Sequence, residues 1–216
     1  MGDMSYGISV EGYHSEDDYG WKLANREDTP PKLRRTVVTV PYSNGVLDYT
    51  GVYGEPFYEE REISYEFAQE FTGIDELNEG VRLFCEWLAG IVNADIHDDM
   101  FDEFHYHGSC TDIATDHEKS GVMAHVTATF TLYPFMVADD ESTDALIVGT
   151  NYVINEGRPV RLTAKSSGSW STIEINGESE RVTGTEKVTA LRLESGLNEI
   201  EVDGSGCTIR WIEERL

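Results

Sequence analysis

The chain has 216 residues, and its 41 acidic and 16 basic side chains give a formal net charge of −25. So acidic a surface repels phosphate, which excludes proteins that hold nucleic acid or anionic membranes through Lys and Arg. Hydrophobic residues at 39% and aromatic residues at 11% allow a folded core, and apolar alternation in many segments excludes a disordered chain. The length predicts one large domain or two smaller ones.

The cysteines and the N-terminal residues bear on where the protein is made. Cys85, Cys110 and Cys207 lie far apart and form no CxxC pair, which favours synthesis in a reducing compartment such as the cytosol. The first residues lack the basic start and apolar run of a signal peptide. No stretch is apolar enough to predict a membrane span.

The first third of the chain has the pattern of strands joined by turns. β-Branched residues fill Arg35–Val40, and Pro41 ends the run because it has no N–H to donate to a ladder. Asn44-Gly45 is a strong two-residue hairpin signal, and the apolar pattern resumes at Val46. Farther on, Glu62–Phe67 alternates apolar and polar residues, which predicts a half-buried strand.

One segment, Asp75–Ile91, has the period of a helix. Its apolar residues recur at steps of four and three and line one face: Leu77, Val81, Phe84, Leu88 and Ile91. Charged residues fill the opposite face: Glu76, Glu79, Arg82 and Glu86. Thr72 and Asp75 offer capping oxygens at the start. We therefore predict one amphipathic helix packed on a sheet.

Strict alternation returns at Val122–Leu132, and Pro134 closes this long strand. The acidic run Asp139–Asp144 has no apolar period and marks a boundary between two domains. We predict an N-terminal domain over residues 1–137, a β-sandwich or split barrel with one α-helix. A smaller C-terminal domain would occupy residues 138–216.

The second domain has the pattern of short strands separated by Gly-containing turns. The predicted strands are Val160–Ala164, Thr172–Ile175, Val188–Leu193, Asn198–Val202 and Cys207–Ile212. Strands at intervals of about ten residues predict a small antiparallel β-sandwich. The fold class expected for the whole chain is therefore mostly β.

Two sets of side chains could bind a metal ion. His105 and His107 lie on one face of a predicted strand, and a third or fourth ligand could come from Cys110, Asp102 or His125. The alternative, an ordinary polar strand face, is favoured because no second pair follows at a ligand-like spacing. Acidic residues also crowd after the helix, where they could hold Ca²⁺: Asp95, Asp98, Asp99, Asp102 and Glu103. They lack the order of a calcium loop, so we predict a solvated acidic loop and no metal site.

Motifs of catalysis are missing from the sequence. It contains no GxSxG, no phosphate-binding Gly loop and no HExxH, and carboxylates are too numerous to single out an acid–base pair. We predict no catalytic residues and no cofactor. Trp170 could stack on a sugar ring, but a core or rim aromatic is the favoured interpretation.

Short stretches in their order along the chain resemble the distal tail protein family of siphophages. They are Thr29–Lys32, Val40–Asp48, Tyr58–Ile63, Trp87–Gly90 followed by Asp95, Phe130–Phe135, Ile173–Gly177 and Ser195–Asn198. The likeness covers nearly the whole chain, and the joint order of the stretches is its specific part.

The resemblance implies a structural protein and not an enzyme. The N-terminal (belt) domain would form a hexameric ring between the tail tube and the tail tip or baseplate, with DNA passing through without specific binding. The C-terminal domain would be a galectin-like sandwich that supports receptor-binding or fibre proteins. The protein, from a phage or a prophage, would be made in the host cytoplasm and end at the tip of the virion tail. Acidic walls would keep DNA from adhering to the ring.

A ring needs contacts between identical chains, and exposed strand edges can supply them. The candidate oligomer edge is formed by Arg35, Val37 and Thr39 with the hairpin at Asn44 and Gly45. Because subunits at −25 repel one another, we expect salt or concentration to promote hexamers.

Two other functions stay open from the sequence. A carbohydrate-binding adhesion module of a phage tail or cell surface would need exposed aromatics along a groove, with Trp170 as the sugar contact. A tail-associated metal-dependent enzyme would need a third ligand beside His105 and His107.

Overall fold

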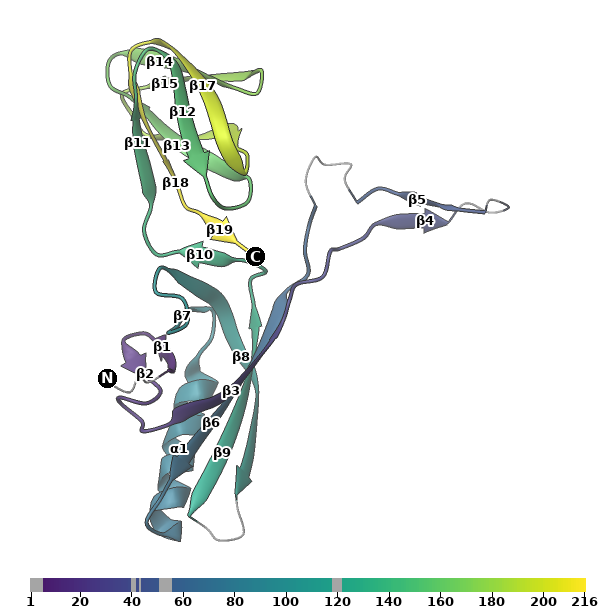
Figure 1. Ribbon diagram of the computed structural model, residues 1–216, viewed down its shortest axis with the longest axis vertical. Coiled ribbons are helices and arrows are strands. Elements are labelled where there is room, and N and C mark those ends of the chain that lie inside the picture. The colour runs from purple at the N-terminus through teal and green to yellow at the C-terminus, as the bar shows by residue number, and fades with distance from the viewer. Residues whose placement is uncertain (1–5, 40–41, 43, 51–55, 118–121) are drawn as a thin grey trace. The chain divides into compact units, whose positions relative to one another are not determined.

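The computed structural model describes residues 6–39, 42, 44–50, 56–117 and 122–216. The chain divides into two compact units, Met1–Phe135 and Met136–Leu216. Most of the described residues lie in antiparallel strands, and α1 (Ile74–Gly90) is the one helix among them (Figure 1). The expected fold class, mostly β with a single helix, is confirmed.

Unit 1 is built on one antiparallel sheet, whose strands lie in the order β2-β1-β7-β8-β9-β6-β3. Their bounds are β1 (Ile8–Val10), β2 (Tyr13–His14), β3 (Lys22–Thr29), β6 (Arg61–Glu70), β7 (Ala94–Asp98), β8 (Phe104–His117) and β9 (Met123–Leu132). Bulges between Leu23 and Asn25 in β3 and between Cys110 and Asp112 in β8 interrupt the ladder and increase its local twist.

The two alternating segments of the first domain form the centre of this sheet. Ile63, Tyr65 and Phe67 in β6 are each 0% exposed, and Ile63 pairs directly with Phe130 of β9. Every second residue of β9 is buried in the same way. The predicted strands are therefore confirmed, with β9 ending at Leu132 before Pro134.

Helix α1 packs on this sheet through aromatic contacts. The Phe84 ring stacks on Trp21, with centroids 4.8 Å apart, and meets Phe67 edge-on at 5.1 Å. Leu77 and Leu88 are 0% exposed, whereas Val81 is only half-buried. The apolar stripe is thus confirmed, with its weakest member at Val81.

The expected cap of α1 is wrong. The helix begins one residue earlier than predicted, so its N-cap is Gly73, which has no side chain to donate or accept. Instead Glu76 accepts hydrogen bonds from the N–H and the hydroxyl of Thr72, at 3.1 and 2.5 Å. In a capping box the third helical residue would accept from the N-cap N–H; here Glu76 accepts from Thr72, one residue before the N-cap, and satisfies a donor just outside the helix.

Unit 2 consists of two four-stranded antiparallel sheets, in the orders β11-β18-β13-β16 and β12-β17-β14-β15. Their bounds are β11 (Ser142–Leu146), β12 (Gly149–Asn155), β13 (Val160–Ser166), β14 (Trp170–Ile175), β15 (Glu178–Thr183), β16 (Lys187–Leu193), β17 (Gly196–Gly204) and β18 (Cys207–Trp211). A short pair, β10 (Met136–Ala138) with β19 (Glu214–Arg215), joins the two ends of the unit.

The five predicted strands of the second domain are all present, but three other strands of the sandwich and the short pair of β10 and β19 were missed. β11 begins inside the acidic run that was interpreted as a boundary, and β12 and β15 were not predicted. The turn at Asn176-Gly177 joins β14 to β15, with φ of 55° and 82°. Positive φ at both central residues is the geometry that this dipeptide favours in hairpins.

The core between the two sheets is apolar. Leu162, Ile173 and Ile200 are 0% exposed and belong to a cluster of buried aliphatic side chains that also includes Trp211. Buried polar side chains of this unit are uncharged: Asn155, Ser166, Ser171, Thr189 and Asn198. Each of them makes a hydrogen bond, for example Thr189 to the carbonyl of Leu162 at 2.9 Å.

Candidate functional site

A two-stranded arm extends β3 and β6 beyond the sheet of unit 1 (Figure 1). Leu33 and Tyr58 form an isolated bridge at its base, where the Arg34 N–H donates to the carbonyl of Phe57 at 2.8 Å. Farther out, β4 (Val37–Thr39) pairs with β5 (Val46–Asp48). Because the arm is only two strands wide, neither of its faces is covered by another described strand.

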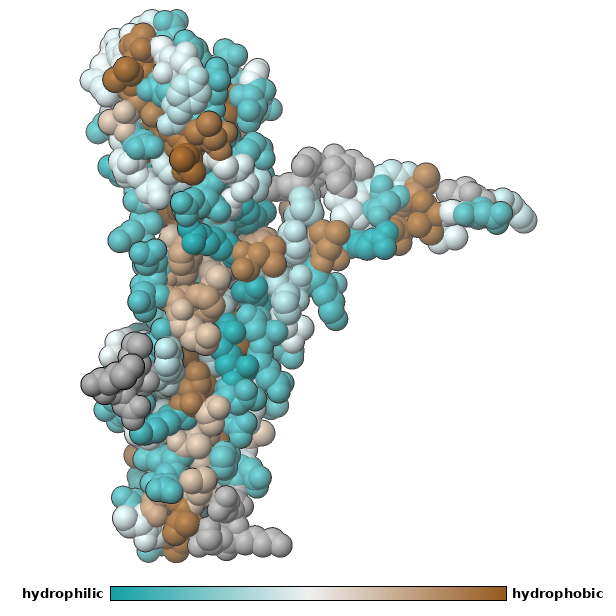
Figure 2. All heavy atoms as spheres, viewed as in Figure 1, coloured by the Kyte–Doolittle hydropathy of each residue, from teal (hydrophilic) through white to brown (hydrophobic). Residues whose placement is uncertain are grey.

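The arm exposes an unusual number of apolar side chains. Their exposed fractions lie between 43% and 53%: Leu33, Val37, Val38, Val46, Leu47, Tyr49 and Phe57. Val38 pairs with Leu47 across the ribbon. Figure 2 shows hydrophobic spheres along this segment. An exposed apolar ribbon with free edges is typical of a segment that pairs with another chain.

The predicted oligomer edge lies on this arm. Arg35, Val37 and Thr39 are all exposed, and Asn44 and Gly45 form the bend before β5. Arg35 donates to Asp48 at 2.8 Å. Hydrogen bonds from Thr50 and Arg35 hold the pKa of Asp48 well below its usual range. Val40, Pro41 and Ser43, which the sequence analysis also placed in this hairpin, lie outside the described residues.

A charged cluster links strands β3, β6, β7 and β8 of unit 1. The Arg26 guanidinium donates to Asp98 at 2.8 Å, to Asp28 at 3.1 Å and to the Tyr106 hydroxyl at 2.9 Å. Tyr65 donates to the same Asp98 oxygen at 2.8 Å. Asp98 has a side-chain exposure of 1%, so its charge depends on these donors.

The cluster alters the acidity of its members. Burial, followed by the neighbouring Asp98, raises the pKa of Tyr65 well above its usual value. Burial also raises the pKa of Tyr106. The nearby aromatic and carboxylate groups raise the pKa of Arg26 although burial opposes this. These groups therefore stay as a fixed neutral and charged set, which suits a structural role.

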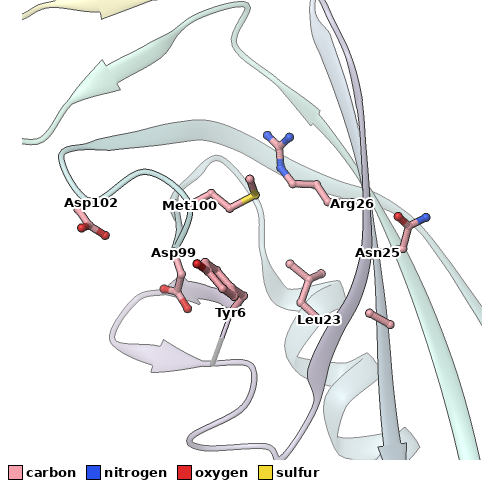
Figure 3. Close-up of a pocket in the computed structure, with 8 residues that line it drawn as sticks. Tyr6, Leu23, Asn25, Arg26, Asp99, Met100 and Asp102 are labelled. Carbon is pink, nitrogen blue, oxygen red and sulfur yellow. The ribbon is translucent and has the colours of Figure 1, made fainter. Parts of the chain in front are cut away.

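A cavity of about 620 Å³ lies beside this cluster (Figure 3). Its lining residues are Tyr6, Leu23, Ala24, Asn25, Arg26, Asp99, Met100 and Asp102. Two of its three charged groups are bound by protein partners: Arg26 by the cluster, and Asp99 by the Gly7 N–H at 2.8 Å and His14 at 3.0 Å. Among the described residues, those that line the cavity include no Ser, Cys, Lys or His.

The histidines of the metal hypothesis share a carboxylate. His105 and His107 do lie on one face of β8, and Asp95 of β7 approaches them at 3.6 and 2.7 Å. His107 also contacts Asn93 at 3.2 Å. Among the described residues, none of the three expected further ligands (Asp102, Cys110 and His125) joins both histidines in a cluster of ligand atoms within 4.8 Å. The pair fits a hydrogen-bonded polar strand face.

Three carboxylates of the acidic segment after the helix, Asp95, Asp98 and Asp99, bind donor groups of the protein itself. Besides the bonds of Asp98 and Asp99 described above, the second Asp98 oxygen accepts from the Met100 N–H at 3.0 Å. Asp95 binds the two histidines. Among the described residues, these carboxylates therefore do not converge on one point as a Ca²⁺ site would require.

Trp170 begins β14 and is half-buried. The Arg181 guanidinium lies 4.7 Å from its ring centroid. A Cβ on Gly204 would come within 2.5 Å of the ring, so the Gly204 backbone, with φ of 90°, packs directly against it. This geometry favours the role of a rim aromatic, and a sugar contact at Trp170 stays a prediction.

Comparison with known proteins shows the fold of the whole chain. No family model and no curated protein sequence matches it. Among solved structures, the chain is similar to the SPP1 Dit protein (gp 19.1), described as a paradigm of the hub adsorption apparatus in phages that infect Gram-positive bacteria. The TM-score is 0.74 at 11% sequence identity, over 98% of this chain and 99% of Dit. The chain has the Dit fold.

Two features of unit 1 escaped sequence reasoning. The charged cluster draws Arg26, Tyr65 and Asp98 from three strands, and nothing in the sequence indicates that these residues meet. The length of the arm was also missed, although the exposed apolar residues on both sides of Asn44-Gly45 gave a signal for it. Within the described residues, no helix has the length and apolarity that a membrane span needs.

Proposed function

We propose that this protein is a distal tail protein of a phage or prophage, a structural hub that forms a hexameric ring between the tail tube and the tail tip or baseplate. The observation that carries the proposal is the Dit fold over nearly the full length of both chains. The location is then the tip of the virion tail, and unit 1 is the belt domain. Unit 2 is the galectin-like domain, and the protein is not an enzyme.

The arm is the proposed contact between neighbouring subunits. It combines two free backbone edges with exposed apolar side chains, which suits strand addition to a second copy. Residues 32–39 also carry three basic side chains (Lys32, Arg34 and Arg35) and no acidic one. In a chain of net charge −25, this basic strand is attracted to the surface of any other copy.

Net charge has a second consequence for the ring. Six subunits repel one another at low salt, so we expect hexamers to form as salt screens the charges or as concentration rises. We propose that acidic groups of unit 1 face the lumen, where they keep passing DNA from adhering. Light scattering across a salt series, with negative-stain images of the largest species, tests the ring directly. A protein that stays monomeric at high concentration and high salt contradicts the proposal.

A pair of variants tests the arm. Val38→Asp with Leu47→Asp places two carboxylates on a cross-strand pair that is 49% exposed on each side. Because both side chains are exposed, we expect unit 1 to fold and the ring to be lost. Val92→Asp is the control, since Val92 is 68% exposed and lies in unit 1 off the arm. Rings that survive the arm variant, or are lost equally in the control, exclude the arm as the contact.

A further inference from the structure

One edge strand of the unit 2 sandwich differs from the other three. The edges of the two sheets are β11 and β16 in one and β12 and β15 in the other. β11, β15 and β16 each carry at least one charged residue, whereas β12, with the sequence Gly-Thr-Asn-Tyr-Val-Ile-Asn, carries none. Charges on edge strands commonly prevent pairing with another chain. β12 lacks this protection.

The outer face next to this edge is apolar. Tyr152 and Ile154 of β12 are 63% and 60% exposed, and Leu197, which pairs with Ile154, is 68% exposed. Their neighbours Val153 and Asn155 point inward and are buried. Figure 2 shows exposed hydrophobic side chains on this unit. β12 thus offers both an unpaired backbone edge and an apolar surface beside it.

Carboxylates lie next to the apolar residues on the same sheet face. Glu199 pairs with Tyr152, and Glu201 is directly opposite Glu174 on β14. No ion pair involves these three glutamates among the described residues, and Glu201 accepts only from Thr150, at 2.8 Å. Like charges directly opposite each other destabilise a sheet, so a cation bound beside these glutamates would reduce their mutual repulsion.

We propose that the β12 edge binds an extended segment of a second protein, one whose long basic side chains alternate along the strand. Its backbone would continue the β12-β17-β14-β15 sheet by strand addition. The stems of its Arg or Lys side chains would cover Tyr152 and Ile154, and their charged ends would reach Glu199 and Glu201 on the neighbouring strand β17. Pairing of two copies through their own β12 edges is disfavoured, because two such faces would bring their carboxylates together.

The inference deepens the proposed function by assigning the place where a hub would hold an adhesion or fibre protein, and it rests on that function. The probe is a synthetic peptide of about eight residues, an ordinary strand length, in which Arg and Val alternate. The matched peptide has Glu in place of Arg. Binding to the full-length protein is measured by calorimetry, and amide exchange shows which backbone groups become protected.

We expect the basic peptide to bind, the acidic peptide not to bind, and protection to appear along β12. Tyr152→Lys with Ile154→Lys removes the apolar surface and adds like charge, so it should weaken binding of the basic peptide by about tenfold or more. A tenfold loss corresponds to about 1.4 kcal/mol. Val188→Lys is the control, because Val188 is 67% exposed on the edge strand β16 of the other sheet. Glu199→Gln with Glu201→Gln should weaken binding without changing the protected strand.

Three results would overturn the inference. The first is no binding of the basic peptide; the second is equal weakening by the β12 variant and the β16 control. The third is self-association of the wild-type chain that the β12 variant alone abolishes, which would make a second copy the occupant. Ring formation is followed in the same samples and should be unaffected by the β12 variant. Peptide binding without rings would contradict only the proposed function, and rings without peptide binding only this inference.

Discussion

The two units bury polar groups in opposite ways. Unit 1 places a full ion pair, Arg26 with Asp98, among aromatic rings in its interior. The buried polar residues of unit 2 carry neutral hydroxyls and amides, such as Ser171 and Asn198, and the rest of its core is mostly aliphatic, with Trp211 among it. A buried ion pair costs desolvation that its attraction hardly repays, so it specifies an arrangement more than it adds stability. The comparison suggests that unit 1 is the part whose strand arrangement must be unique.

The largest expected effect tests the apolar support that unit 1 still needs. Leu88→Asp places a carboxylate where the wild-type side chain is 0% exposed. Because no donor awaits it there, we expect unit 1 to unfold. Far-ultraviolet circular dichroism should lose the helical signal, while amide exchange in unit 2 stays slow. The exposed position Leu83, 44% exposed on the same helix, gives the control Leu83→Asp, which should remain folded.

The next effect isolates the ion pair. Asp98→Ala removes the acceptor shared by Arg26 and Tyr65 and leaves the Arg26 guanidinium, whose side chain is 15% exposed, with only Asp28 and Tyr106 as partners. We expect a loss of about 3–5 kcal/mol in the free energy of unfolding of unit 1, measured by denaturant titration with amide exchange. Asp203→Ala, at an exposed position in unit 2, should change stability by less than about 0.5 kcal/mol. A loss below about 1 kcal/mol for Asp98→Ala would show that the pair does not hold the strands.

The third expected effect is a difference between the two units in stability at alkaline pH. The pKa of Tyr65 is raised in the folded state, so the stability that Tyr65 contributes to unit 1 is fully present below the ordinary tyrosine pKa of about 10. It is lost as the pH rises from there toward the raised folded value. Unit 2 contains a single tyrosine, Tyr152, which is 63% exposed. We therefore expect unit 1 to open first above about pH 10, with phenolate absorbance and amide exchange as readouts and Tyr65→Phe as the variant that delays the opening.

The smallest effect concerns a turn of unit 2. Gly177 has φ of 82°, and a Cβ added there would meet open space, so Gly177→Ala meets backbone strain alone. We expect a cost of about 1–2 kcal/mol in the stability of unit 2 and none in unit 1. Gly45→Ala also meets open space but carries no positive φ, and should change stability by less than about 0.5 kcal/mol. Equal costs at the two sites would contradict the strain argument.

How far the sequence predicted the structure depends on where each signal lies. The helix and the strands β6 and β9 were predictable because the local spacing of their apolar residues indicates which face is buried. β12 was missed because its outward residues, Tyr152 and Ile154, are apolar and the inward Asn155 is polar, so the alternation that marks an ordinary strand is hidden. That failure and the proposed docking edge have the same physical origin.

The candidate sites show the same limit. Arg35, Val37 and Thr39 were predictable as an exposed edge because the hairpin signal is local. The charged cluster was not, because Arg26 and Asp98 are separated by 72 positions and meet only through the strand order of the sheet. The histidines were predicted to share a face and do so, but the carboxylate between them comes from a different strand.

The strand order of unit 2 also has a consequence for how the protein forms during synthesis. Its first sandwich strand, β11, pairs with its last, β18, through partners such as Ser142 and Trp211. Unit 1 can complete its own sheet while unit 2 is still being translated, but the unit 2 sandwich cannot close until β18 has left the ribosome. Until then the uncharged β12 is exposed on a nascent chain together with the unpaired apolar core. The acidic surface of unit 1, already folded on the same chain, would keep neighbouring nascent chains apart during that interval.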